Sequence, residues 1–127
     1  MSEKEIQIEV KGYRGLEVWK RSRLLVKHIY EASASFPQSE IYGLTSQLRR
    51  ATVSIVANIV EGNARFSKKE YAHFISIAHG SAAETCALIE LASDLNYISL
   101  ENADKIVQDS EIISKMLNKL RTSLAIG

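Results

Sequence analysis

Apolar residues recur at spacings of three and four along four stretches of the chain, which is the periodicity of an α-helix with one buried face. The pattern predicts helices over residues 16–35, 44–64, 68–95 and 100–124, and strand signals are nearly absent. Helices of similar length joined by short links are typical of bundles. The sequence therefore predicts an all-α fold, an up-down-up-down antiparallel four-helix bundle.

Two local signals mark the ends of these helices. Proline disfavours helix in the residue before it, so Phe36-Pro37 ends the first helix. Ser67-Lys68-Lys69-Glu70 is a capping box, in which the serine oxygen accepts a hydrogen bond from an early backbone N–H and the glutamate reaches back to the cap residue. We therefore expect the third helix to follow Ser67 directly.

Length and composition indicate one domain. The chain has 127 residues, 46% of them hydrophobic, which is enough for a continuous core. Residues 1–12 alternate apolar and polar positions only weakly, so we expect a short N-terminal arm there and the bundle domain over residues 13–127. No stretch approaches the roughly 20 apolar residues of a membrane span. The single cysteine, Cys86, fits a reducing cytoplasm, and we expect a cytoplasmic protein.

The formal net charge of +1 hides an uneven distribution. Six basic residues and one acid lie between Lys11 and Lys27, whereas seven acids and one lysine lie between Glu84 and Glu111. This asymmetry could steer an anionic ligand, or it could serve the packing of subunits in an oligomer. The sequence leaves both interpretations open.

The second predicted helix carries polar residues as regularly spaced as its apolar ones. They could form a ligand pocket at the bundle end or between subunits, where arginine and asparagine side chains fix a small polar group. They could instead satisfy one another as a buried network that sets helix register and subunit contact, which we favour. These polar residues are Arg50, Ser54, Asn58, Glu61 and Arg65, and they lie beside the apolar face of Leu48, Ala51, Ile55 and Ile59.

Signatures of catalysis are weak. Glu70 and His73 form an E-x-x-H, a spacing that di-iron four-helix proteins use, but the second such motif that those sites require is missing. The three histidines share no chelating spacing, and no serine has a nucleophile-elbow context. Cys86 lies beside alanine and leucine, as a small core residue does. We therefore expect no enzymatic activity, no cofactor and no metal site.

Several short motifs follow one another in a characteristic order: FP, E-x-YGLTSQLRRA, NIVEG, R-x-SKKEY and GSAAE. On these motifs the chain resembles the bacterial four-helix-bundle proteins named for an open reading frame in intervening sequences of 23S ribosomal RNA genes. The resemblance covers residues 13–120 and is densest over residues 47–84. One departure is Val56, where many relatives have proline, so we expect the helix to continue without a kink.

The resemblance implies a left-handed bundle that assembles as a ring-shaped homopentamer. A more distant relation, the accessory protein of diversity-generating retroelements, shares the bundle and the pentamer and works with a reverse transcriptase and nucleic acid. Nucleic-acid binding is therefore an expectation by analogy. The family name reflects where the first genes were found and does not establish ribosome binding.

Basic residues on the second and third helices are the candidates for such binding. Five subunits that present them on one face of a ring would create a strong local potential. Against this interpretation, the sequence shows no interleaved exposed aromatic residues and no glycine-rich phosphate loop, and two arginines could pair with glutamates. The candidate anion-binding residues are Arg49, Arg50, Arg65, Lys68 and Lys69, and the candidate polar network or pocket comprises Ser54, Asn58, Glu61 and Glu84.

Gly80 lies inside the third predicted helix, where glycine costs about 1 kcal/mol relative to alanine. It is easier to explain if a second backbone or a bulky side chain comes close, from the same chain or from another subunit. Trp19, Tyr42 and Phe66 lie off the main apolar faces and favour another subunit, although they could also pack over loops. We expect a non-enzymatic binding or scaffold protein, with an RNA- or DNA-binding accessory factor as the alternative.

Overall fold

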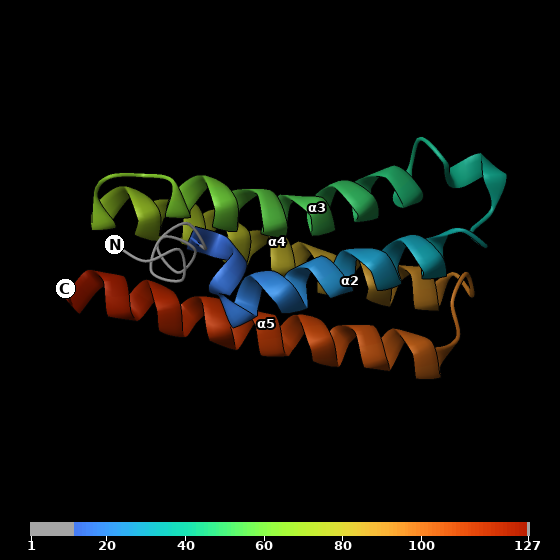
Figure 1. Cartoon of the computed structure of the whole chain (residues 1–127). Coiled ribbons are helices and arrows are strands. Elements are labelled where there is room, and N and C mark those ends of the chain that lie inside the picture. The colour runs from blue at the N-terminus through green and yellow to red at the C-terminus, as the bar shows by residue number, and fades with distance from the viewer. Residues whose placement is uncertain (1–11, 127) are drawn as a thin grey trace, which may run out of the picture.

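The computed structural model describes residues 12–126, which form a bundle of four long helices (Figure 1). Consecutive helices run in opposite directions, and no strand occurs in this part of the chain. The predicted all-α fold and its four helical segments are confirmed. Of the predicted N-terminal arm only Gly12 lies within the described residues. The helices are η1 (Gly12–Gly15), α2 (Glu17–Ser33), η2 (Gln38–Glu40), α3 (Leu44–Asn63), α4 (Lys68–Asp94) and α5 (Leu100–Ile126).

One continuous core fills the bundle, because each long helix directs one apolar face inward. Contacts link α2 to α3, α3 to α4, α4 to α5 and α5 back to α2, so the four helices enclose this core on all sides. The side chains that are almost fully buried include Leu25 and Ile29 of α2, Leu48, Ile55 and Ile59 of α3, Ile75 and Ile89 of α4, and Ile113 and Leu117 of α5.

Hydrogen bonds at the helix ends agree with the capping signals. The Ser67 hydroxyl accepts a hydrogen bond from the Glu70 backbone N–H at 3.1 Å, as the capping box predicts. At the end of α4, Asn96 adopts φ 62°, and the Tyr97 N–H donates to the Ala92 carbonyl at 2.9 Å. This left-handed residue closes a Schellman-type turn, which redirects the chain toward α5.

α3 and α4 approach each other closely through small residues. A Cβ added to Gly62 would lie 2.9 Å from the Phe74 Cβ, closer than Cβ atoms are found in proteins, and 3.1 Å from the Tyr71 carbonyl oxygen, which is also tight. The Thr52 and Thr85 hydroxyls lie 3.4 Å apart in the buried centre of the same helix pair. Only glycine fits at position 62, so this contact fixes how the two helices are aligned.

None of the helices in residues 12–126 is both long enough and apolar enough to cross a membrane. The helical stretch of α3 continues through Val56 from Leu44 to Asn63, in agreement with the absence of proline at that position.

Two adjacent isoleucines of α5 provide a test of the core. Ile113 is 1% exposed and Ile112 is 42% exposed. We expect Ile113→Ala to lower the free energy of unfolding by about 2–5 kcal/mol, because it leaves a cavity, and Ile112→Ala to change it by less than about 1 kcal/mol. Urea denaturation followed by circular dichroism at matched protein concentration measures both values. Equal losses in the two variants would contradict the assignment of the α5 core face.

Candidate functional site

The polar residues of α3 divide into two groups, of which the first joins α3 to α4. The Ser54 and Ser81 hydroxyl oxygens lie 2.9 Å apart across the helix pair. The Asn58 Nδ2 donates to the Ser54 carbonyl at 2.8 Å and to the Ser54 hydroxyl at 3.0 Å. All three side chains are half-buried. This arrangement is an inter-helix polar network, which sequence spacing along α3 alone does not reveal because Ser81 lies on another helix.

The second group lies at the exposed end of α3 and does not join that network. Arg65, two residues beyond the end of α3, forms an exposed ion pair with Glu61 in the last turn of the helix. The Arg65 guanidinium also lies 4.7 Å from the centre of the Phe74 ring. The expected ion pair between a candidate arginine and Glu61 is therefore present. Glu61 and Phe74 both contact the Arg65 guanidinium.

Arg50 and Glu84 lie at the outer edge of the polar network. Together with Gln47, Ser54 and Ser81 they line a shallow cavity of about 360 Å³ between α3 and α4. Both charged side chains are exposed, and within residues 12–126 neither forms an ion pair. A small polar molecule in this cavity would meet both charges and the serine hydroxyls, so it is where a ligand could contact the network.

Arg49 is half-buried and contacts α2. Its Nε donates to the buried Ser33 hydroxyl at 2.9 Å, and its guanidinium lies 4.6 Å from the centre of the Tyr30 ring. The Ser33 hydroxyl in turn donates to the Ile29 carbonyl at 2.7 Å. Arg49 therefore connects α2 to α3.

The antiparallel arrangement separates charge along the bundle axis. The level of the Ser54–Ser81 contact divides the bundle into a basic half, residues 12–23, 56–78 and 113–126, and an acidic half, residues 24–55 and 79–112. The basic half has ten lysines and arginines and three acidic residues. The acidic half has four lysines and arginines and nine acidic residues. Figure 1 shows the α3–α4 turn and the end of α5 at the same end of the bundle.

The predicted anion-binding residues do not form one cluster. Arg65, Lys68 and Lys69 belong to the basic half, whereas Arg49 and Arg50 belong to the acidic half. The basic half also contains three residues that our sequence reasoning missed, because they lie about fifty residues farther along the chain and approach only through the antiparallel order of α4 and α5. They are Lys115, Lys119 and Arg121.

Aromatic side chains lie beside some of the basic residues of this half: Tyr13 and Trp19 are half-buried, and Phe66 is exposed. The Tyr13 and Trp19 rings pack edge to face with their centres 5.3 Å apart. The Arg14 guanidinium lies 4.6 Å from the Tyr13 ring centre, and that of Arg23 lies 5.2 Å from the Trp19 ring centre. Phe66 is fully exposed in the α3–α4 turn. The sequence did not indicate this cluster because η1 must fold back onto α2 to form it.

Chemically reactive groups are not brought together in residues 12–126. Burial raises the pKa of the Cys86 thiol, which favours the neutral form over the nucleophilic thiolate. His73 packs edge to face on Phe74 with ring centres 5.6 Å apart. No group of three or more histidine, cysteine, aspartate or glutamate side chains in this range is placed to hold a metal ion. The absence of enzymatic activity stays a prediction.

The Ser54–Ser81 contact provides a test of the polar network. We expect Ser54→Ala and Ser81→Ala each to destabilise the protein by about 0.5–1.5 kcal/mol, and the double variant to lose less than the sum, because both substitutions remove the same hydrogen bond. Glu61→Ala is the control and should cost less than about 1 kcal/mol, since its ion pair is exposed. Urea denaturation measures all four variants, and strictly additive losses would contradict the coupling.

A protein family and several solved structures match this chain. The family described as "23S rRNA-intervening sequence protein" matches residues 14–119. The chain is also similar to a crystal structure from Bacteroides thetaiotaomicron VPI-5482, described as a protein with unknown function from the S23 ribosomal protein family. The two chains share 28% sequence identity with a TM-score of 0.71, and the similarity covers 79% of this chain and 94% of that chain. No curated protein matches the sequence. With most of its length matched, this chain belongs to the 23S rRNA-intervening sequence protein family.

Proposed function

We propose that the protein is a non-enzymatic binding or scaffold protein of the cytoplasm, and that it assembles into a homo-oligomeric ring. The observation that carries this proposal is the surroundings of Gly80. A Cβ added there would meet nothing within 4 Å, so the isolated chain gives no steric reason for glycine. Glycine inside a helix costs about 1 kcal/mol relative to alanine. A second subunit packed against this position would explain the residue.

The residues around Gly80 support a helix-packing surface. Ile77 and Leu91 are 40% and 50% exposed, and Ala87 is also exposed. With Gly80 and Glu84 between them, these residues are spaced alternately by three and four, as in a coiled-coil face. This face of α4 points away from the bundle's own core, so α4 has a second face suited to a partner helix.

A ring requires two different surfaces that meet in each contact. The Gly80 face is one of them, and Glu84 at its centre places a carboxylate where a basic residue of a neighbouring copy would be favourable. The number of five subunits rests on the family resemblance alone. A scaffold role follows from the same argument, because such a surface holds copies of the chain together and leaves other surfaces free for partners.

Two substitutions at Gly80 test the ring. We expect Gly80→Leu to dissociate the oligomer, because the larger side chain would occupy the space of the partner helix, while the isolated chain has room for it. Gly80→Ala is the matched control for helix propensity and should raise the stability of the dissociated chain by about 1 kcal/mol. Sedimentation velocity measures the assembly, and circular dichroism verifies the helix content. An unchanged oligomer in Gly80→Leu would contradict this interface.

Nucleic-acid binding is the second candidate function, and the basic half of the bundle favours it. Ten basic side chains against three acids form a strongly positive region. Exposed Phe66 adds an aromatic surface of the kind that stacks on unpaired bases. In a ring of parallel bundles these regions would all lie on one face of the assembly.

Substitution of two lysine pairs distinguishes nucleic-acid binding by the basic half from general electrostatic attraction to the protein. We expect Lys68→Ala with Lys69→Ala to weaken binding of a labelled RNA hairpin and to reduce the slope of log affinity against log salt by about 1 for each phosphate that a lysine no longer neutralises. Lys27→Ala with Lys105→Ala removes the same charge from the acidic half and should have little effect. Fluorescence anisotropy between about 50 and 200 mM salt measures both. Absence of binding at the lowest salt would exclude this function.

A further inference from the structure

α3 has a second face of regularly spaced residues, which lies on the side away from the core of its own bundle. Its members are spaced alternately by four and three, as in a coiled-coil face. None belongs to the buried core, and Val53 and Ala57 at its centre are exposed. We call these residues the α3 outer face: Ser46, Arg50, Val53, Ala57 and Val60. Like the Gly80 face of α4, it is a helix surface with an apolar centre that one copy of the chain leaves uncovered.

A groove runs beside the α3 outer face, between α3 and α2. Its volume is about 600 Å³. Tyr30, Ile41 and Val53 line it and are 44%, 44% and 41% exposed, so much of their apolar surface is open to solvent. On α3 the groove extends from Thr45 to Ala57. The α3 outer face is therefore hollowed where exposed apolar side chains gather.

The Ser54–Ser81 contact shows which residues of α3 and α4 lie level with each other along the bundle. Because the two helices are antiparallel, counting outward from this pair places the groove level with residues 78–90 of α4. The Gly80 face extends from Ile77 to Leu91. The groove and the Gly80 face thus span nearly the same height on one chain.

A ring brings these two surfaces together. When the bundles lie parallel to the ring axis, rotation about that axis leaves every residue at its own height. The Gly80 face of one copy then meets the groove and the α3 outer face of the next copy over nearly their full length. Gly80 lies at a height between Val53 and Ala57, and the small Ala57 side chain allows the two helices to approach closely.

Charge favours the same pairing. Glu84 is the one charged residue of the Gly80 face, and Arg50 is the one charged residue of the α3 outer face. Their heights differ by a single residue. Both side chains are exposed, and neither forms an ion pair within residues 12–126. A carboxylate and a guanidinium that meet across a contact select both the partner surface and the register.

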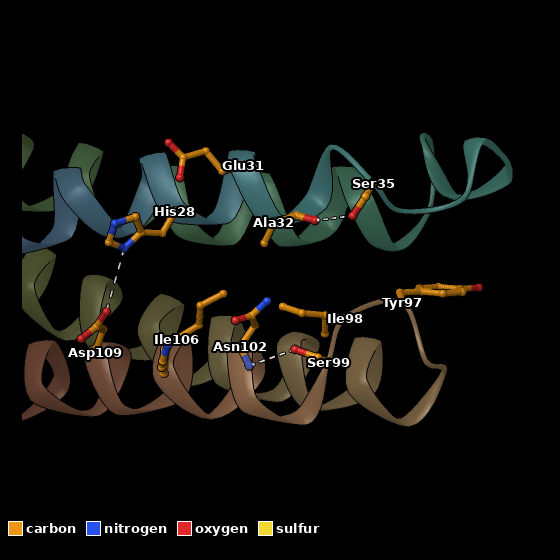
Figure 2. A pocket seen from close by; sticks show the side chains of 11 residues that line it. His28, Glu31, Ala32, Ser35, Tyr97, Ile98, Ser99, Asn102, Ile106 and Asp109 are labelled. Carbon is orange, nitrogen blue, oxygen red and sulfur yellow. Dashed lines mark hydrogen bonds and ion pairs between the residues drawn. The ribbon is translucent and has the colours of Figure 1, made fainter.

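The α2–α5 side of the bundle fits the Gly80 face less well. The Cys86 Sγ lies 4.0 Å from the Val107 carbonyl oxygen. Counting from this pair, Asp109 of α5 lies level with Glu84. Figure 2 shows Asp109 facing His28 of α2 across the groove between these two helices. A carboxylate at this height would repel Glu84 of a neighbouring copy.

We propose that the α3 outer face and its groove receive the Gly80 face of the neighbouring copy, with Glu84 of one chain beside Arg50 of the next. The inference rests on the proposed ring and names both surfaces of its contact. The two surfaces differ and lie on different helices, so each copy uses one surface toward each of its neighbours and the contacts close into a ring.

Charge reversal distinguishes this contact from a pair within one chain, because Arg50 and Glu84 also line one cavity of the same bundle. We expect Arg50→Glu and Glu84→Arg each to raise the protein concentration at which the ring dissociates by about tenfold or more, since like charges then meet. Co-expression of the two variants should restore assembly, because every contact between unlike copies joins opposite charges. Pairing within one chain predicts no such recovery. Lys27→Glu reverses an exposed charge outside both surfaces and is the matched control. Sedimentation velocity measures all of these.

Cross-linking between two singly substituted chains tests the register. In a Cys86→Ala background, a short bismaleimide should join chains with Ala57→Cys to co-expressed chains with Ile77→Cys, because these positions lie nearly level across the contact. It should also join Ser46→Cys to Leu91→Cys. The crossed combinations are the controls and should not be joined, since Ser46 and Ala57 lie about 16 Å apart along α3. Denaturing gel electrophoresis of chains with tags of different size identifies products that contain both chains.

The outcomes separate this pairing from the ring itself. Equal cross-linking of the crossed combinations, or an intact ring in which the matched positions are not joined, would overturn the pairing and leave the proposed ring standing. Unchanged assembly of both charge-reversal variants would do the same. Sedimentation of the unsubstituted protein as a single chain would overturn the ring and the pairing together. Circular dichroism verifies that each variant is folded.

Discussion

The close contact between α3 and α4 is the constraint on which the rest of this structure depends. Gly62 allows α3 to touch Tyr71 and Phe74 directly, and the hydroxyls of Ser54 and Ser81 meet only when the two helices keep this alignment. A shift by one turn would move both contacts by about 5.4 Å and separate them. Steric fit and hydrogen bonding therefore select the same register, and neither needs a charged group in the core.

This register also determines where the charges lie. The chain has a net charge of +1, yet antiparallel order places Lys68 and Lys69 of α4 at the same end as Lys119 and Arg121 of α5. Seven of the eight acids of these two helices lie in the other half, and the exception is Glu70. The uneven charge along the sequence thus places positive charge at one end of the bundle and negative charge at the other. An anionic and a cationic partner would be attracted to opposite ends. Net charge alone conceals this property.

Much of the fold could be predicted because its signals are local. Apolar spacing identified the core face around Ile55 and Ile59, and the Ser67 capping box identified the start of α4. The partners of individual polar groups could not be predicted, because they depend on register between helices. Arg49 was a candidate for binding an anion, yet it contacts Ser33, sixteen residues away on α2. Spacing along α3 grouped Ser54 with Glu61, whereas the structure joins Ser54 to Ser81 on α4.

Two glycines show why sequence cannot separate packing within a chain from packing between chains. Gly62 and Gly80 both lie within helices, where each glycine lowers helix stability by a similar amount relative to alanine. At Gly62 the neighbouring helix of the same chain fills the space that a side chain would need, so the fold itself accounts for glycine. At Gly80 that space is empty, while Ile77 and Leu91 on the same face remain exposed. The packing of one chain therefore accounts for glycine at position 62 and not at position 80, although the two positions look alike in the sequence.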